Sequence, residues 1–149
     1  MSTEAALQLV SPGSRPAPKR DIVTRWGGDA AIMANGYVAV PVHFLMKYAA
    51  MKPFCLTVPE AMFVVQVMAF KWDEKAPFPG YKKVAARMGI SEAYARKLAR
   101  GLEGKGFLRR VARVGSTNAF DFQPLFDKLL PHAKAEGEVV RAMTPEAAA

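Results

Sequence analysis

Basic side chains are concentrated in one short stretch of the sequence, between residues 81 and 113. The ten that lie there are Lys82, Lys83, Arg87, Arg96, Lys97, Arg100, Lys105, Arg109, Arg110 and Arg113. Only Glu92 and Glu103 oppose them, so the stretch carries a net charge of +8, the same as the whole chain. A cationic surplus confined to one stretch indicates a surface for a polyanion, because neutralisation of phosphates drives affinity for nucleic acids. The alternative is a solvated basic helix face without a partner.

The residue types that catalysis and metal binding require are scarce in this chain. Its two histidines, His43 and His132, lie far apart, and its one cysteine, Cys55, excludes an intrachain disulfide and a thiolate metal site. The sequence has no nucleophile-elbow, phosphate-loop or paired-ligand motif. We therefore expect no enzyme activity, no metal and no cofactor. Cys55 is expected to be a buried thiol, since Phe54 and Leu56 flank it.

The basic residues fall on a predicted helix-turn-helix. Residues 81–88 and 91–104 are expected to be helices, with Ser91 as the N-cap of the second. The break between them contains Gly89, which tolerates the left-handed conformation that the turn needs. Apolar residues recur at helical spacing and predict the inward face of the pair, which consists of Val84, Ala85, Met88, Ile90, Ala95, Leu98, Ala99 and Leu102.

The outward face of the second helix carries the candidate DNA-reading residues, because an α-helix fits the major groove. Arg96 can bind guanine in bidentate fashion, and Lys97 and Arg100 can do the same or hold phosphate. Glu92 can accept a hydrogen bond from cytosine N4 or cap the N-terminus of the helix with its carboxylate. Tyr94 can reach a phosphate or pack on the first helix. The full set of candidates on the two helices is Lys82, Lys83, Ser91, Glu92, Ala93, Tyr94, Arg96, Lys97 and Arg100.

A β-hairpin is predicted directly after this helix. Residues 107–114 and 119–122 form the expected strands, and residues 115–118 form the turn. Basic residues on a hairpin beside a reading helix suit a wing that lies along the DNA backbone or minor groove. The candidate wing contacts are Arg109, Arg110, Arg113, Ser116 and Thr117. The alternative is an ordinary edge hairpin whose charges oppose aggregation.

The remaining sequence divides into an arm, a domain and a tail. Residues 1–35 are expected to be a flexible arm, which Trp26 can pin to the domain; residues 36–133 form the DNA-binding domain, and residues 134–149 a flexible tail. No apolar stretch reaches the length of a membrane span, and the N-terminus lacks the pattern of a signal peptide.

Four elements are expected in the domain outside the helix-turn-helix and the hairpin. Residues 37–41 predict a short strand and residues 42–50 a short helix. Thr57 and Glu60 have the spacing of a capping box, which starts a helix that runs to about residue 72. This helix is apolar nearly all round, so we expect it to be central in the fold or to form a protein contact or homodimer seam. A last amphipathic helix begins at Pro124.

These segments together resemble the winged helix-turn-helix domains of plasmid and phage replication proteins and related transcriptional regulators. The stretches that carry the resemblance are Phe78–Tyr81, Val84–Ser91, Leu102–Leu108, Gly115–Phe122 and Pro124–Phe126. The order of elements over residues 36–72 is also similar, so the resemblance covers about two-thirds of the chain. Tyr94 stands where the family commonly has a small threonine, and Lys97 where arginine is common, so no preference for a DNA sequence is carried over. The fold itself serves repressors, initiators and bridging proteins alike.

We predict an α+β, mainly helical protein: a winged helix-turn-helix domain with a C-terminal β-hairpin wing and flexible termini. Its expected function is sequence-specific binding of double-stranded DNA, first as a transcriptional regulator. The alternatives are a replication initiator or accessory DNA-binding protein of a plasmid or phage, and a winged helix that bridges proteins without binding DNA. We expect double-stranded DNA and a second copy in a homodimer as partners, no membrane or small-molecule effector, and a cytoplasmic, nucleoid-associated location.

Overall fold

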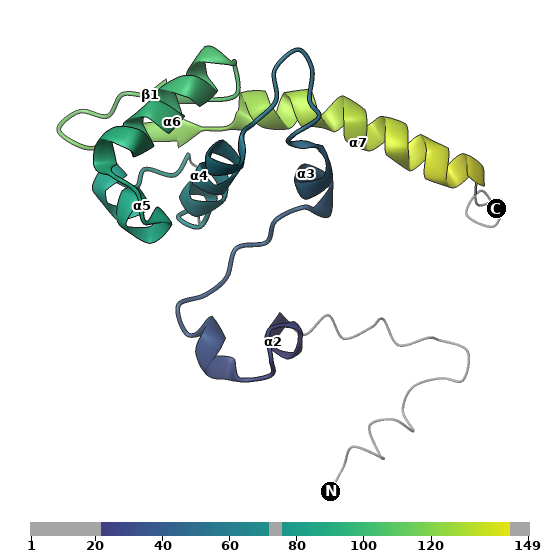
Figure 1. Ribbon diagram of the computed structural model, residues 1–149, viewed down its shortest axis with the longest axis horizontal. Helices are drawn as coiled ribbons and strands as arrows, with labels where there is room; N and C mark the ends of the chain where they lie inside the picture. Colours follow the sequence, from purple (N-terminus) through teal and green to yellow (C-terminus); the bar gives the residue numbers. More distant parts are fainter. Residues whose placement is uncertain (1–21, 72–75, 144–149) are drawn as a thin grey trace, which may run out of the picture. The chain divides into compact units, whose positions relative to one another are not determined.

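The computed structural model describes residues 22–71 and 76–143, and the chain divides into two units, Met1–Tyr37 and Val38–Ala149 (Figure 1). In the first unit, the short helix α2 spans Ile22–Arg25 and the 3-10 helix η1 spans Ala30–Met33. Asp29 caps η1 by accepting a hydrogen bond from the Ala31 N–H at 2.9 Å. Neither helix buries a residue, and Trp26 is 66% exposed, so its role in pinning the arm stays a prediction.

The second unit begins with an extended segment and a short helix. Residues 38–41 are extended but form no strand, so the predicted strand at residues 37–41 is wrong: no segment of the described chain supplies a neighbouring strand for its backbone. Helix α3 spans Val42–Lys47, shorter than predicted. The loop that follows exposes Cys55, so the expectation of a buried thiol is also wrong.

Helix α4, Val58–Met68, is the central helix of this unit. The capping box predicted for Thr57 and Glu60 is present: the Glu60 N–H donates to Thr57 Oγ1 and the Thr57 N–H donates to Glu60 Oε1. Ala61, Phe63, Val64 and Val67 are buried, and the helix packs against both α5 and α6. It is central in the fold, as the sequence predicts, and it ends before the predicted residue 72.

Two helices and a hairpin follow in the predicted order. Helix α5 spans Tyr81–Met88 and helix α6 spans Glu92–Gly104; between them Gly89 adopts φ +68°, in the left-handed region. Ser91 caps α6 by accepting from the Tyr94 N–H at 3.1 Å. Strands β1, Arg109–Val111, and β2, Ala119–Asp121, pair antiparallel, with Arg110 opposite Phe120. The hairpin is confirmed, with shorter strands than predicted.

The core is formed where these elements meet. Phe63 of α4 and Tyr81 of α5 both contact the ring of Phe120 edge-on, at centroid distances of 5.8 and 5.6 Å. Helix α7, Gln123–Met143, leaves the hairpin and contacts α3 (Figure 1). It continues past residue 134, where the sequence predicted that helical order would end. Three helices followed by a two-stranded hairpin are the arrangement of a winged helix.

Candidate nucleic-acid interface

Helix α6 presents a basic face to solvent because its larger aliphatic residues lie on the opposite, buried side. Ala95, Leu98, Ala99 and Leu102 are buried against α4 and α5, whereas Lys97 and Arg100 are exposed. Ala93 shares the exposed face, one turn before Lys97. Within the described part of the chain, no carboxylate forms an ion pair with Lys97 or Arg100. Both charges are therefore available to a ligand.

Arg96, the candidate guanine reader, is held by two neighbours. Its Nη2 donates to Glu92 Oε1 at 2.7 Å, one helical turn earlier, and its guanidinium carbon lies 5.3 Å from the centre of the Tyr81 ring. Both side chains of the ion pair are nearly half exposed, so the pair is worth only about 0.5 kcal/mol. A base or phosphate can displace it at little cost.

The two arginines of strand β1 form ion pairs within the protein. Arg110 donates through Nε and Nη2 to the two carboxylate oxygens of Glu103, each at 2.8 Å. These bonds hold the pKa of Glu103 below its ordinary value of 4.5 and raise that of Arg110. Arg109 is paired with Asp121 on the opposite strand. The pairs join β1 to α6 and to β2, so both arginines have a structural role whether or not they touch DNA.

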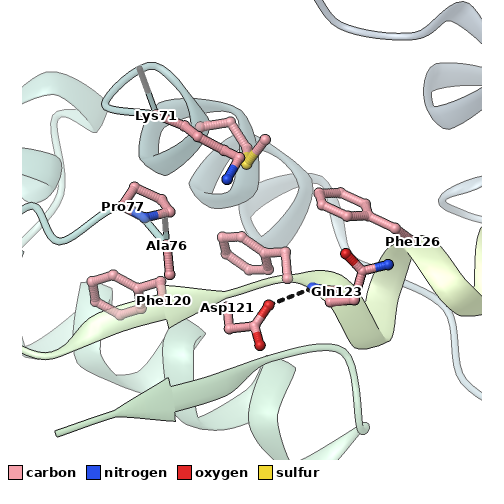
Figure 2. Close-up of a pocket in the computed structure, with 9 residues that line it drawn as sticks. Lys71, Ala76, Pro77, Phe120, Asp121, Gln123 and Phe126 are labelled. Atoms are coloured by element: carbon pink, nitrogen blue, oxygen red, sulfur yellow. Dashed lines mark hydrogen bonds between the residues drawn. The ribbon is translucent and has the colours of Figure 1, made fainter. Parts of the chain in front are cut away.

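Asp121 also lines a cavity of about 210 Å³ beside the hairpin (Figure 2). Burial opposes ionisation of this carboxyl, but the Gln123 N–H donates to it at 2.9 Å and Arg109 donates to its other oxygen. The pKa of Asp121 consequently lies below its ordinary value of 3.8. The carboxylate thus stays charged at neutral pH, where it caps the start of α7 and holds Arg109.

Arg113 is the wing arginine without such a carboxylate among the described residues. Its guanidinium carbon lies 3.7 Å from the centre of the Phe78 ring, which is 52% exposed. Thr117, a predicted DNA contact, donates its hydroxyl to the Phe78 carbonyl at 2.8 Å. Ser116 is exposed in the same loop. The loop of the wing, between β1 and β2, thus forms a cluster with an aromatic ring and a cation.

The basic residues of α5, the candidates Lys82 and Lys83 together with Arg87, divide into two kinds. Lys82 is exposed in its first turn, without an ion pair to any described residue. Lys83 and Arg87 instead lie over the ring of Phe70, at 5.6 and 4.4 Å from its centre. These contacts place two cations over Phe70, just after the end of α4, and neither cation forms an ion pair with a carboxylate among the described residues.

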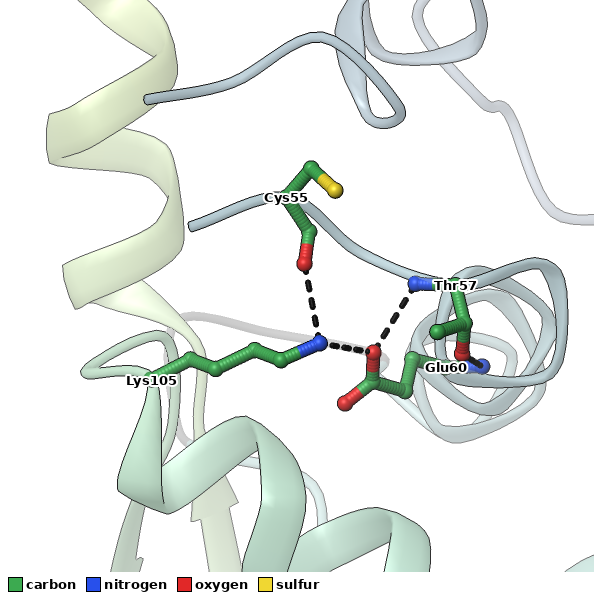
Figure 3. A network of polar contacts seen from close by, with 4 residues as sticks. All are labelled: Cys55, Thr57, Glu60 and Lys105. Atoms are coloured by element: carbon green, nitrogen blue, oxygen red, sulfur yellow. Dashed lines mark hydrogen bonds and ion pairs between the residues drawn. The ribbon is translucent and has the colours of Figure 1, made fainter. Parts of the chain in front are cut away.

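Lys105, the C-cap residue of α6, is half-buried, and its charge is paired within the protein. Its Nζ donates to Glu60 Oε1 at 2.6 Å and to the Cys55 carbonyl at 2.9 Å (Figure 3). Glu60 is 4% exposed. The network ties the end of α6 to the start of α4, and it therefore fixes the orientation of the basic face relative to the central helix.

The residues that the structure describes contain no group of three or more His, Cys, Asp or Glu side chains that could hold a metal ion. They also contain no helix of the length and apolar character that a membrane crossing requires.

Fold and surface together define the class of protein: a winged-helix domain whose helix α6 has a basic outer face. The model of the DnaD N-terminal domain family matches residues 40–140 of this chain. Because this match spans well over half of the sequence, the chain belongs to that family of winged-helix replication-protein domains.

Comparison with solved structures found similar proteins. The crystal structure of the N-terminal domain of DnaD protein from Geobacillus kaustophilus HTA426 is 26% identical with a TM-score of 0.55, over 78% of this chain and 94% of that chain. A MarR-family transcriptional regulator from Rhodococcus sp. RHA1 is 20% identical with a TM-score of 0.39, over 82% of this chain and 75% of that one. No curated protein matched the sequence.

The structure thus divides the predicted DNA-binding residues into groups with different neighbours. Lys82, Lys97 and Arg100 are exposed and without a described ion pair, whereas Arg109 and Arg110 are each bonded to a carboxylate. Phe78 is not among the residues that the sequence predicts to contact DNA. The sequence pattern that could have indicated a role for Phe78 is proline, aromatic, proline at residues 77–79, because two prolines stiffen the segment that carries the large side chain.

Proposed function

We propose that this protein binds double-stranded DNA through helix α6 in the major groove and the hairpin wing alongside it, in a role connected with DNA replication. The observation that carries the proposal is the exposed basic face of α6, where Lys97 and Arg100 have no described carboxylate partner. Charges left unpaired on a projecting helix favour a polyanion, because the gain from releasing counterions is not opposed by breaking internal ion pairs.

The contacts support distinct proposed tasks for the candidates. Lys97, Arg100 and Lys82 bind phosphates, and the amide end of α6 at residues 91–93 adds a further anion site. Arg96 reads a guanine after leaving Glu92, since a bidentate arginine–guanine pair discriminates by about 1–3 kcal/mol and the surface ion pair is worth less. Tyr94, 37% exposed, lies in the first turn of this helix and borders the same face.

The replication role is supported by membership of the DnaD N-terminal domain family. A role as a transcriptional regulator, the first prediction from the sequence, shares the same DNA-binding surface but has no support beyond the fold. Either role places the protein on the nucleoid in the cytoplasm.

We further propose that the protein acts as a homodimer through α3 and not through α4. Helix α3 buries Phe44, yet Val42, Leu45 and Met46 on its other sides are 68%, 55% and 59% exposed. An apolar groove of about 250 Å³ lies beside it, lined by the extended residues 38–41 together with side chains of α4 and α7. Contiguous exposed apolar surface of this kind favours a protein contact, and a two-fold dimer would present two α6 helices to DNA.

Titration of a random-sequence duplex against salt tests DNA binding. Each phosphate contact contributes about 0.9 to the slope of log affinity against log salt concentration. Lys97→Gln and Arg100→Gln should each lower that slope by about 0.9. Lys134→Gln, an exposed lysine on α7, is the matched control and should leave the slope unchanged. Fluorescence anisotropy of a labelled duplex measures all four proteins.

Two outcomes contradict the proposal. A wild-type protein that leaves the duplex unbound at micromolar concentration favours the protein-bridging winged helix. Equal slopes for the Lys97, Arg100 and Lys134 variants would show that a different surface holds the phosphates.

A further inference from the structure

Phe78 occupies a position that forces an aromatic ring into solvent. It lies between Pro77 and Pro79, and both prolines are buried while Phe78 is 52% exposed. Successive side chains of an extended segment point to opposite sides, so burying the two prolines turns the ring outward. The prolines also remove backbone freedom at both flanks. The ring cannot move inward unless this whole segment is displaced.

The segment is fastened to the wing at two points. The Phe120 N–H donates to the Pro77 carbonyl at 2.7 Å, and the Thr117 hydroxyl donates to the Phe78 carbonyl at 2.8 Å. Gly80, which precedes α5, brings the same segment close to Thr117, because a Cβ there would lie 3.8 Å from its methyl group. The exposed ring is therefore held at the junction between the wing and the start of α5, which carries Lys82.

Arg113 covers part of the ring and remains without a carboxylate among the described residues. A separation of 3.7 Å between its guanidinium carbon and the ring centre is a close stacking contact. Arg109 and Arg110 differ from it, because each is bonded to an acidic side chain. One of the Arg113 nitrogens, Nη1, is buried without a hydrogen-bond partner in the described structure. An aromatic ring joined to an uncommitted guanidinium is the pair of groups that proteins use to stack a nucleobase beside a phosphate.

We propose that Phe78 and Arg113 form a stacking platform for an unpaired nucleobase next to the duplex that α6 and the wing bind. The proposal rests on the proposed function, since it needs the wing to face DNA. The unpaired state follows from the geometry of the ligand: a base inside a continuous duplex has both faces covered by its neighbours, so an exposed ring cannot stack on it unless it has left the helix. The protein would thus prefer the boundary between double-stranded and single-stranded DNA over a continuous duplex.

Three DNA probes of the same duplex sequence test the platform with the full chain. The first is a blunt duplex, the second carries single-stranded thymidine extensions at both 5′ and 3′ ends, and the third carries abasic extensions of equal length and charge. Base–aromatic stacking predicts that the thymidine probe binds at least about fivefold more tightly than the abasic probe. Phosphate attraction alone predicts equal affinity for these two probes.

Variants locate the effect. Phe78→Leu keeps an apolar side chain and should abolish the preference for thymidine over abasic extensions, with the affinity for blunt duplex unchanged. Phe78→Tyr retains a ring and should retain the preference. Phe54→Leu is the matched control, because Phe54 is exposed to the same degree, 53%, in the loop before α4.

The results separate this inference from the proposed function. Equal affinity of the wild-type protein for thymidine and abasic extensions overturns the platform, while binding of the blunt duplex upholds the duplex interface. A loss of blunt-duplex affinity in Phe78→Leu that matches its loss for the thymidine probe also overturns it, because the ring would then act as a wedge in the groove. No binding of any probe overturns both. If Phe78→Leu does not fold, the affinities of the wild-type protein and of Phe78→Tyr for the thymidine and abasic probes still test the platform.

Discussion

At the scale of single residues, Glu60 shows how a charged side chain is kept in the interior of this protein. The carboxylate is 4% exposed, and it accepts from the Thr57 N–H at 2.8 Å and from Lys105 Nζ at 2.6 Å. A buried charge is tolerated only when it is paired and hydrogen-bonded. Glu60 therefore depends on a lysine that the charge pattern alone assigns to the basic surface.

Removal of that lysine should destabilise the fold. Lys105→Met leaves the Glu60 carboxylate buried without its partner, so we expect the free energy of unfolding to fall by about 3 kcal/mol. Lys97→Met removes an exposed lysine from the same helix and should change it by less than about 0.5 kcal/mol. Urea denaturation followed by circular dichroism measures both. Equal losses for the two variants would contradict the role assigned to the network.

The ion pair between Glu103 and Arg110 predicts a dependence of stability on pH. Hydrogen bonds from Arg110 hold the pKa of Glu103 in the folded protein below its ordinary value of 4.5. The stabilisation is therefore fully present above pH 4.5 and is lost as the pH falls from there through the folded-state pKa. Glu103→Gln lacks this contribution at every pH.

The stability advantage of the wild-type protein over Glu103→Gln should therefore shrink on acidification from about pH 6 to about pH 3. Thermal unfolding of the two proteins across this range measures the difference, which cancels the titration of the other carboxyls. An advantage that grows at low pH has the wrong sign for a depressed pKa. It would show that Arg110 does not stabilise the charged form of Glu103.

At the scale of elements, helix α6 combines two glycines that face different surroundings. A Cβ added at Gly101 would lie 3.0 Å from Glu60 Oε2, whereas a Cβ at Gly104 would meet no atom within 4 Å. Glycine weakens a helix interior by about 1 kcal/mol relative to alanine. At Gly101 the absence of a side chain permits the close approach of α6 to the start of α4, which compensates for the weaker helix. At Gly104 the structure shows no contact that compensates for it.

Alanine substitutions should therefore have different effects at the two positions. Gly104→Ala should raise the free energy of unfolding by about 0.5 kcal/mol, because it stabilises the last turn of the helix without a new contact. Gly101→Ala should give no such gain and should lower stability, since its methyl group crowds the buried carboxylate. Chemical denaturation of both variants under the same conditions measures the difference. A larger gain from Gly101→Ala would mean that α4 and α6 can separate freely.

At the scale of the whole molecule, the exposed apolar side chains of α3 predict self-association. Leu45→Glu places a charge on the proposed dimer surface, so it should convert a dimer to a monomer while the second unit remains folded. Val114→Glu is the control, because Val114 is a fully exposed apolar residue in the wing. Light scattering over a range of concentrations measures the mass of each protein. A wild-type monomer at all concentrations, or dissociation by Val114→Glu alone, would place the contact elsewhere or remove it.

Local signals in the sequence are sufficient to predict the start of helix α4 and the helix-turn-helix formed by α5 and α6. The caps at Thr57 and Ser91, the apolar spacing in 81–104 and the glycine at 89 act within a few residues, and the structure confirms the elements they predict. The prediction of a strand at residues 37–41 is wrong because a strand needs a partner strand, which the described part of the chain does not offer. The prediction of a buried Cys55 thiol is wrong because apolar neighbours in the sequence do not bury a side chain unless the fold covers that side chain.

The sequence by itself determined that a basic helix and hairpin would form, because helix periodicity, capping and turn chemistry are encoded locally. Only the tertiary structure decided which cations remain available. Lys105 contacts Glu60, Arg109 contacts Asp121 and Arg113 contacts the ring of Phe78. The two residues of each contact are separated in the sequence, so local patterns do not predict the contact. Ion pairing and stacking act over a few ångströms in space, so the charge that a ligand can use depends on which distant segments the fold brings together.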